Sequence, residues 1–274
     1  MFQIPLKTKL IFQAFILLLL LSSCDLDKEI EVVLPPFKKE LVVECYVERE
    51  MPIKVLVTET DPYFDTLRFP FVNDAEIQLK RGLVLDSIPL SPYLDFASRK
   101  FYNYGQTWAN SDTTQPLELT VKSKDGRYLT GSTQFLPLPD IDTVEVRYSS
   151  ENDSLAGILV WINDFQNQSN FYRVIMNLDS LTGAPAVDFT FTDNGLDGNK
   201  FPVGTSFRFE KGKTMFVRLY HVEQQYYNYL RAMEAAARAN GNPFAQPATV
   251  YSPMKGGGFG IFTTLNYRTI KLKL

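Results

Sequence analysis

The sequence predicts a mainly β protein with two β-sandwich-like (Ig-like) domains and one amphipathic helix in its C-terminal half. Three observations support this fold class: short segments in which apolar and polar residues alternate, a proline-rich break at mid-chain, and one stretch with helical spacing. Alternation with a period of two is typical of a strand that buries one face. A series of such strands separated by turns favours a sandwich.

The alternating segments give most of the expected strands. The tetrapeptide 124–127 is a tight-turn signal, because Gly126 can adopt a positive φ angle, and it should join two neighbouring strands. We expect strands at residues 41–47, 75–80, 117–123, 127–135, 143–148, 156–163, 171–178, 207–209, 214–221 and 270–274.

Pro137 and Pro139 interrupt the pattern near the middle of the chain. Proline cannot donate a hydrogen bond to a neighbouring strand, and two prolines in three residues favour an extended linker. We therefore predict an N-terminal domain at 40–136 and a C-terminal domain at 137–274.

One stretch, 223–240, has helical spacing. Its apolar positions recur every three or four residues, and Gly241 is a suitable stop. A tyrosine-rich face of this kind could bind a ligand, but we expect it to pack against a sheet. The face consists of Tyr226, Tyr229, Leu230, Met233, Ala236 and Ala237.

Three successive glycines, 256–258, follow the helix. They lack the lysine–serine pair and the helix start of a phosphate-binding loop. We expect them to let the chain cross tightly against the sheet, with Phe259 or Phe262 anchoring it in the core. On this interpretation Gly257→Val should destabilise the protein, because a β-branched residue tolerates positive φ poorly.

Residues 1–23 have the pattern of a lipoprotein signal peptide. Lys7 and Lys9 precede an apolar run at 10–21, which is too short to cross a bilayer of about 30 Å as a helix. The run ends in Leu-Ser-Ser-Cys, which resembles a lipobox, so Cys24 is predicted to be the lipidated first residue of the mature protein. The alternative is an ordinary signal peptide with an incidental cysteine.

The acyl chains would anchor the protein to a membrane rather than make it span one. Residues 24–39 are predicted to form an acidic tether. If Cys24 is acylated, Cys45 has no partner in the chain, and we expect it to be a buried free thiol that acts as a small hydrophobe.

The composition argues against several classes of function. With 28 basic and 31 acidic residues the formal net charge is −3, which gives no electrostatic reason to expect a nucleic-acid partner. His221 is the only histidine, so a site with several histidine ligands is excluded, and we expect this imidazole to be structural. No catalytic or cofactor motif is present, and we predict no cofactor.

Two acidic possibilities remain. The segment 193–198 faintly resembles a calcium loop, but the glutamate that an EF-hand needs is replaced by Gly204, so we expect a plain turn and no metal. Glycosidase chemistry needs only two carboxylates, and therefore a carboxylate-based hydrolase stays an alternative.

Aromatic residues gather in two further stretches, 63–71 and 93–108, which we interpret as long loops. Such residues can bind a sugar, a peptide or a protein partner, or they can cap one end of a sandwich. Our candidates for contact with a partner or ligand are Phe69, Phe71, Tyr102 and Trp108.

Four stretches together resemble a family of Bacteroidota outer-membrane lipoproteins, the domain of unknown function 4249, although Cys45 stands where the family often has glycine. Members are often encoded beside TonB-dependent receptors. The stretches are 41–47, 136–142, 161–174 and a run from His221 through 242–247 to 256–262.

The resemblance implies β-sandwich-like domains and a lipid-anchored place at the outer membrane, on the cell surface. It also implies an accessory or ligand-capturing partner of a TonB-dependent transporter, without established catalytic residues. The alternatives are the hydrolase and a structural or adhesive surface module. A deep acidic cleft would favour the hydrolase, and a large apolar patch without a pocket would favour the surface module.

Overall fold

Strands dominate the computed structural model, which describes residues 37–62, 69–96, 98–109, 113–239 and 250–274, with the side chains of 107–109 left aside. Lys39–Leu274 form one compact unit. The signal peptide, Cys24, most of the tether, Tyr63, Phe64 and the stop at Gly241 lie outside the described residues. Within the described part of the chain, no helix is long and apolar enough to span a membrane.

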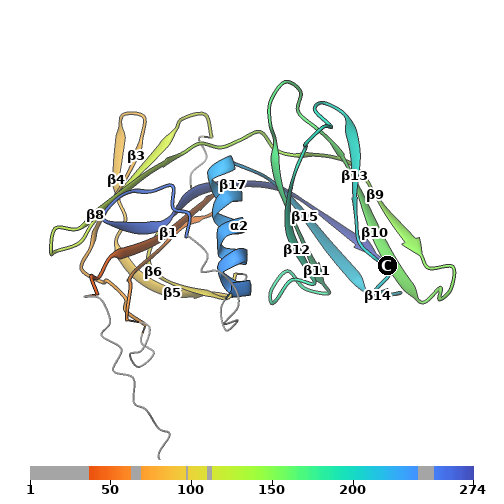
Figure 1. The fold of residues 1–274 in the computed structure, drawn as a ribbon, viewed down its shortest axis with the longest axis horizontal. Coiled ribbons are helices and arrows are strands. Elements are labelled where there is room, and N and C mark those ends of the chain that lie inside the picture. Colours follow the sequence, from red (N-terminus) through yellow and green to blue (C-terminus); the bar gives the residue numbers. More distant parts are fainter. Residues whose placement is uncertain (1–36, 63–68, 97, 110–112, 240–249) are drawn as a thin grey trace, which may run out of the picture. The chain divides into compact units, whose positions relative to one another are not determined.

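An eight-stranded sheet forms the centre of the unit (Figure 1). In spatial order its strands are β12 (Val187–Thr192), β11 (Phe171–Leu178), β15 (Thr214–Val222), β17 (Gly258–Lys273), β1 (Leu41–Glu48), β2 (Pro52–Glu59), β6 (Lys100–Ala109) and β5 (Leu90–Asp95).

Two smaller sheets complete the fold. The five-stranded sheet has the order β16 (Lys255–Gly256), β8 (Tyr128–Thr133), β7 (Leu117–Lys122), β3 (Glu76–Arg81) and β4 (Val84–Ser87). The four-stranded sheet contains β13 (Lys200–Gly204), β10 (Leu155–Asn163), β14 (Phe209–Glu210) and β9 (Asp140–Tyr148), the last paired with β10. The prediction of a mainly β fold with sandwich-like layers and one helix in the described chain is confirmed.

The apolar side chains of these strands form two large cores. The first, which we call the N-terminal core, contains Val43, Cys45, Val55 and Leu119, so it joins β1 and β2 to the five-stranded sheet. The second, the C-terminal core, contains residues of β10, β11 and β15 and joins the other end of the eight-stranded sheet to the four-stranded sheet. Cys45 is a buried free thiol, as predicted, and burial raises its pKa.

β17 connects the two ends of the eight-stranded sheet. It pairs with β15 in antiparallel and with β1 in parallel orientation, and the second pairing sets Cys45 opposite Phe262. The sheet therefore takes strands from both sides of the boundary predicted after Leu136. Whether residues 40–136 fold alone stays a prediction.

The glycine segment crosses closely against β1, as predicted, and Phe262 is buried in the N-terminal core. A Cβ atom on Gly258 would lie 2.1 Å from the carbonyl oxygen of Leu41, and Gly260 has a φ angle of +146°. The expectation for Gly257 was wrong: a Cβ atom there would have no neighbour within 4 Å, because this residue lies between the tight positions.

The helix α2 (Gln224–Ala239) lies across the face of the eight-stranded sheet opposite the two cores (Figure 1). Its tyrosine face is packed, as predicted. Tyr226 and Tyr229 are buried, and Arg173 of β11 donates a hydrogen bond to the Tyr226 hydroxyl at 2.7 Å. Met233 is exposed, so the helix is anchored by its first turns.

Candidate functional site

His221 lies at the end of β15 and is structural, as predicted. Its Nδ1 is 3.1 Å from the carbonyl oxygen of Pro137, and its Nε2 is 3.1 Å from Oδ1 of Asn170. The ring is stacked between Phe165 and Tyr172, with centroids 4.9 and 5.3 Å away. Burial lowers the pKa of His221, so the imidazole is held neutral.

The same region fixes the proline linker to the sheet. Thr264 donates its hydroxyl to the carbonyl of Gln134 at 2.7 Å, and Asn266 donates its amide to the carbonyl of Leu136 at 2.8 Å. With His221, three side chains thus meet three carbonyl groups of a segment whose prolines cannot pair as a strand. His221 is accounted for by this role rather than by acid–base catalysis.

Asp193 and Asp197 come together with Asp164, and one carboxylate oxygen of each lies within 4.8 Å of the others. Oxygens in such a group could hold a hard cation. Each carboxylate also has a partner in the protein: Asp164 accepts from the Tyr172 hydroxyl at 2.7 Å, and the other two accept from backbone N–H groups at 2.9 and 2.8 Å. Two of these bonds join the turn predicted at 193–198 to residues 167–170, and the turn itself is closed by the backbone N–H of Leu196, which donates to the carbonyl of Asp193 at 2.7 Å.

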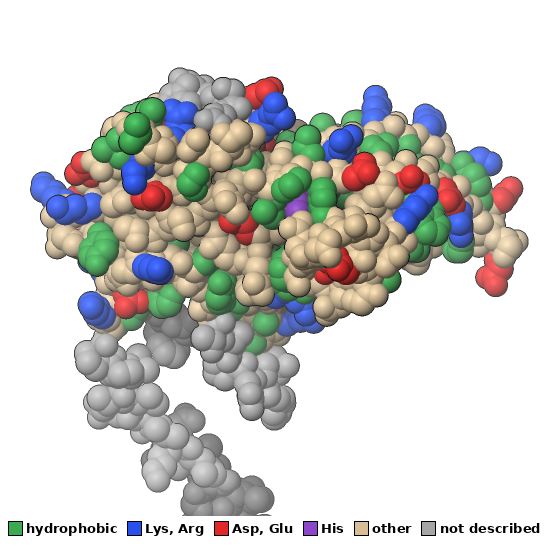
Figure 2. Space-filling view, turned by 90° about the horizontal axis from the view of Figure 1, so that it is seen from above, with side chains coloured by type: hydrophobic (Ala, Val, Ile, Leu, Met, Phe, Trp, Pro, Cys, Tyr) green, Lys and Arg blue, Asp and Glu red, His purple; other side chains and the backbone are tan. Residues whose placement is uncertain are grey.

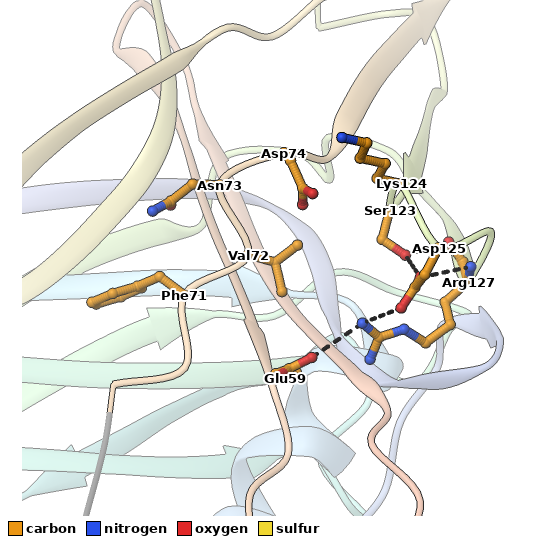
Figure 3. Close-up of a pocket in the computed structure, with 9 residues that line it drawn as sticks. All are labelled: Glu59, Phe71, Val72, Asn73, Asp74, Ser123, Lys124, Asp125 and Arg127. Atoms are coloured by element: carbon orange, nitrogen blue, oxygen red, sulfur yellow. Dashed lines mark hydrogen bonds and ion pairs between the residues drawn. The ribbon is translucent and has the colours of Figure 1, made fainter.

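A hollow with a volume of about 620 Å³ opens beside β2 and the β7–β8 turn (Figure 3). Polar side chains dominate its lining. They are Glu59, Asn73, Asp74, Ser123, Lys124, Asp125 and Arg127, with Phe71 and Val72 completing the wall.

Arg127 holds two of the carboxylates in this hollow. Its Nη2 lies 3.1 Å from Glu59 and 2.7 Å from Asp125 (Figure 3). The hydrogen bond from Lys39, aided by Arg127, lowers the pKa of Glu59, and that from Arg127 lowers the pKa of Asp125. A general acid needs a raised pKa. The pKa values of these two carboxyls are instead lowered, which does not suit either of them to the role of a general acid.

Two of the predicted contact residues form an exposed aromatic stack. Phe69 is 79% exposed, and its ring lies 6.0 Å from that of Phe71. Phe71 lies 4.9 Å from Phe101 of β6, which pairs with Leu94 of β5. We call Phe69, Phe71 and Phe101 the aromatic stack. It connects a loop and a strand that are distant in sequence.

The other two predicted residues do not join the aromatic stack. Tyr102 is buried beneath α2, and its neighbour Tyr104 is buried in the N-terminal core on the opposite face of the sheet. Residues two apart in a regular strand lie on the same face, and Asn103 interrupts this alternation. The Asn103 side-chain amide forms hydrogen bonds with the backbone N–H and C=O of Val57 at 2.8 and 2.9 Å. Trp108 is part of β6, and its side chain lies outside the described residues.

Sequence reasoning missed a second exposed apolar group at the β3–β4 hairpin. Leu83 is fully exposed, and Val84 and Leu85 are mostly exposed. The signal was present, because three consecutive apolar residues follow Gly82 at a turn. Alternation does not reveal this group, because three consecutive apolar residues do not alternate with polar ones.

Charged side chains of both signs are intermixed on the face seen from above (Figure 2). Charged side chains are also paired in the described chain, as in the bidentate contact between Arg173 and Asp188. A mixed surface of this kind does not concentrate the positive potential that attracts a polyanion.

Comparisons with known proteins identify one family. A family model described as "Domain of unknown function (DUF4249)" matches residues 27–271. No curated protein matches the sequence. Among solved structures, a chain of "Cytokine receptor complex - Crystal form 1A" matches 84% of this chain and 95% of its own length, with 10% identity and a TM-score of 0.28. That score carries no conclusion.

Proposed function

Since this chain belongs to the family described as domain of unknown function 4249, we propose that it is a lipid-anchored protein of the outer membrane, on the cell surface, that assists a TonB-dependent transporter. Its role would be that of an accessory or ligand-capturing partner without catalysis of its own. The resemblance supplies the location and the neighbouring transporter. The aromatic stack is the observation that carries the binding role.

Exposed aromatic side chains that stack on one another are costly to leave in water and are enriched at protein interfaces. Phe69 and Phe71 lie next to the point where the predicted tether enters the fold, because Thr60 donates a backbone hydrogen bond to Glu40 and Glu59 donates one to Pro70. A partner embedded in the membrane would be met on this side of the protein.

The hydrolase alternative has less support. Lys39 and Arg127 lower the pKa values of two carboxyls of the hollow, Glu59 and Asp125. Glu223 has a pKa raised by burial, but it is bound to Thr133 and Gln134, away from the hollow. Within the described residues, therefore, the carboxyl with the raised pKa does not share a cleft with that pair of carboxyls.

Co-purification from native membranes tests the partner role. The wild-type protein should recover a TonB-dependent transporter, and Phe69→Ala with Phe71→Ala should reduce recovery about tenfold or more, since each aromatic anchor can contribute over about 1 kcal/mol. Leu83→Ala with Leu85→Ala removes equally exposed side chains elsewhere and is the matched control. Recovery of no transporter by the wild type would overturn the proposal, and equal recovery by all variants would remove the aromatic stack from it.

The anchor has its own test. Cys24→Ala should leave the protein without diacylglycerol and misplaced in the cell, because the thiol carries the lipid. Mass spectrometry of the mature N-terminus measures this directly. An unmodified N-terminus that begins at another residue would contradict lipidation while leaving the partner experiment valid.

A further inference from the structure

The structure points to a membrane contact at the tip of the β5–β6 hairpin: we infer that residues 94–96 and 98–101 rest in the headgroup region of an anionic bilayer. This inference rests on the anchor of the proposed function for its location. Its evidence is separate, and it concerns a different partner, lipid, and mainly different residues from the transporter contact.

The tip exposes apolar side chains on both strands and on the turn. Leu94 of β5, Phe96 of the turn and Phe101 of β6 are 50%, 71% and 38% exposed. Leu94 and Phe101 are directly opposite each other in the register, so their side chains form one surface. Three apolar groups at the end of a two-stranded ribbon can leave water together when the tip enters the headgroup region of a bilayer.

The charges at the tip are arranged unequally. Arg99 is exposed and forms no ion pair within the described residues, and Lys100 is exposed beside Glu44. The acidic residue of the tip, Asp95, is turned inward: its side chain is 12% exposed and lies 2.9 Å from Lys54. The tip therefore presents one unpaired cation, Arg99, beside its apolar groups, and a cation beside exposed apolar side chains favours contact with an anionic membrane surface.

Contacts within the protein hold the described residues of the tip. Ser98 donates its hydroxyl to Asp95 at 2.8 Å, and Arg99 adopts a φ of +56° to close the turn. Lys54 bridges Asp95 to Glu48 of β1. Residues that are already held lose little conformational entropy when they contact a membrane. More of the free energy gained by removing their apolar surface from water therefore contributes to binding.

The tip lies on the side from which the chain enters the fold. Lys39 pairs with Glu59, Glu59 bonds to Pro70, and the adjacent Phe71 contacts Phe101 of the hairpin. Figure 1 shows β5 and β6 along the side on which the chain enters β1. An acylated tether that attaches here would bring the tip to the bilayer.

The β3–β4 hairpin provides the contrast. It also exposes apolar side chains, but Arg81 and Asp86 pair with each other at 2.8 Å beside them, so its rim is neutral. It belongs to the five-stranded sheet and not to the eight-stranded sheet, which the chain enters at β1. It is therefore the natural control.

Vesicle binding by the unlipidated chain from residue 25 onward tests the inference. The vesicles contain phosphatidylethanolamine and phosphatidylglycerol in a ratio of about three to one. Replacing Leu94, Phe96 and Phe101 with serine should weaken partitioning about tenfold or more, whereas serine at Leu83, Val84 and Leu85 should leave it unchanged. Arg99→Glu should weaken binding to these vesicles and not to neutral phosphatidylcholine vesicles.

A second measurement stands even if the triple variant fails to fold. The fluorescence of the Phe96→Trp variant should shift to the blue with vesicles and be quenched by brominated acyl chains, while the Leu83→Trp variant should not respond. The inference is overturned if the unlipidated wild type does not bind, if both triple variants bind equally, or if the fluorescence of the Phe96→Trp variant is not quenched. If the wild type does not bind vesicles but still recovers the transporter, the membrane contact alone is refuted. Tip-dependent vesicle binding with no transporter recovery would refute the partner role alone.

Discussion

The two cores of the molecule are assembled differently. Every residue of the C-terminal core comes from 156–274, after the proline linker. The N-terminal core takes most of its residues from 41–129 but is completed by Met254 and Phe262, from the far end of the chain. One sandwich is thus built from contiguous sequence, and the other needs both ends of the chain. The comparison teaches that a linker in sequence need not separate independent folding units.

The largest effect is expected when the two halves of the chain are produced as separate fragments. We expect residues 40–136 alone to lack a cooperative transition, because β1 loses its parallel partner and the core loses Phe262, while residues 137–274 keep every residue of the C-terminal core. Circular dichroism during thermal unfolding measures both fragments. Joining 250–274 to the first fragment through a flexible linker should restore folding, and a cooperative melt of 40–136 without it would contradict the dependence.

A single substitution at the β1–β17 contact should lower the stability of the protein, because the N-terminal sandwich depends on this pairing. A Cβ atom on Gly260 would lie 1.9 Å from the carbonyl oxygen of Val43 at a positive φ, so Gly260→Ala should cost about 2 kcal/mol or more of unfolding free energy. Gly257→Ala, at an open position, is the matched control and should be close to neutral. Urea denaturation distinguishes them, and equal midpoints would show that the two strands separate easily.

His221 should make the junction sensitive to pH. The folded protein holds this imidazole neutral, so below its ordinary pKa of 6.5 the unfolded chain binds more protons. Stability should therefore fall as the pH drops through that value. His221→Gln keeps a hydrogen-bonding side chain and should flatten this part of the curve. Parallel pH profiles of wild type and variant, measured by chemical denaturation, would argue against a neutral His221.

The smallest effect is expected from metal removal. Asp164, Asp193 and Asp197 already accept hydrogen bonds within the C-terminal half, so neither a chelator nor added calcium should move the melting temperature. Differential scanning fluorimetry is sufficient for this comparison. A rise with calcium that Asp193→Asn abolishes would instead identify the three carboxylates as a cation site.

Sequence reasoning succeeded where the determining physics is local. The strand expected at 117–123 and the turn after it follow from side-chain alternation and from one glycine, and β7 ends one residue earlier, at Lys122. The helix follows from its apolar spacing, and α2 differs by one residue at each end from the range expected. These features depend on neighbours within a few positions.

Features that depend on residues far apart in the sequence could not be predicted from it. Nothing near Leu41 indicates that it will pair with Gly258. Alternation would put Tyr102 and Tyr104 on one face, and only the approach of β2 reveals that Asn103 separates them. Phe69 and Phe71 were proposed as contacts from composition, whereas the third member of their stack, Phe101, was brought in by the fold.

The pairing of β1 with β17 also determines when the fold can be completed. A chain that emerges N-terminus first releases β1 early, but its parallel partner is among the last residues to appear. Until then one edge of β1 has no strand to bond, and the N-terminal core lacks Phe262. The N-terminal sandwich should therefore close only after the whole chain is free, and pairings of such long sequence separation form slowly.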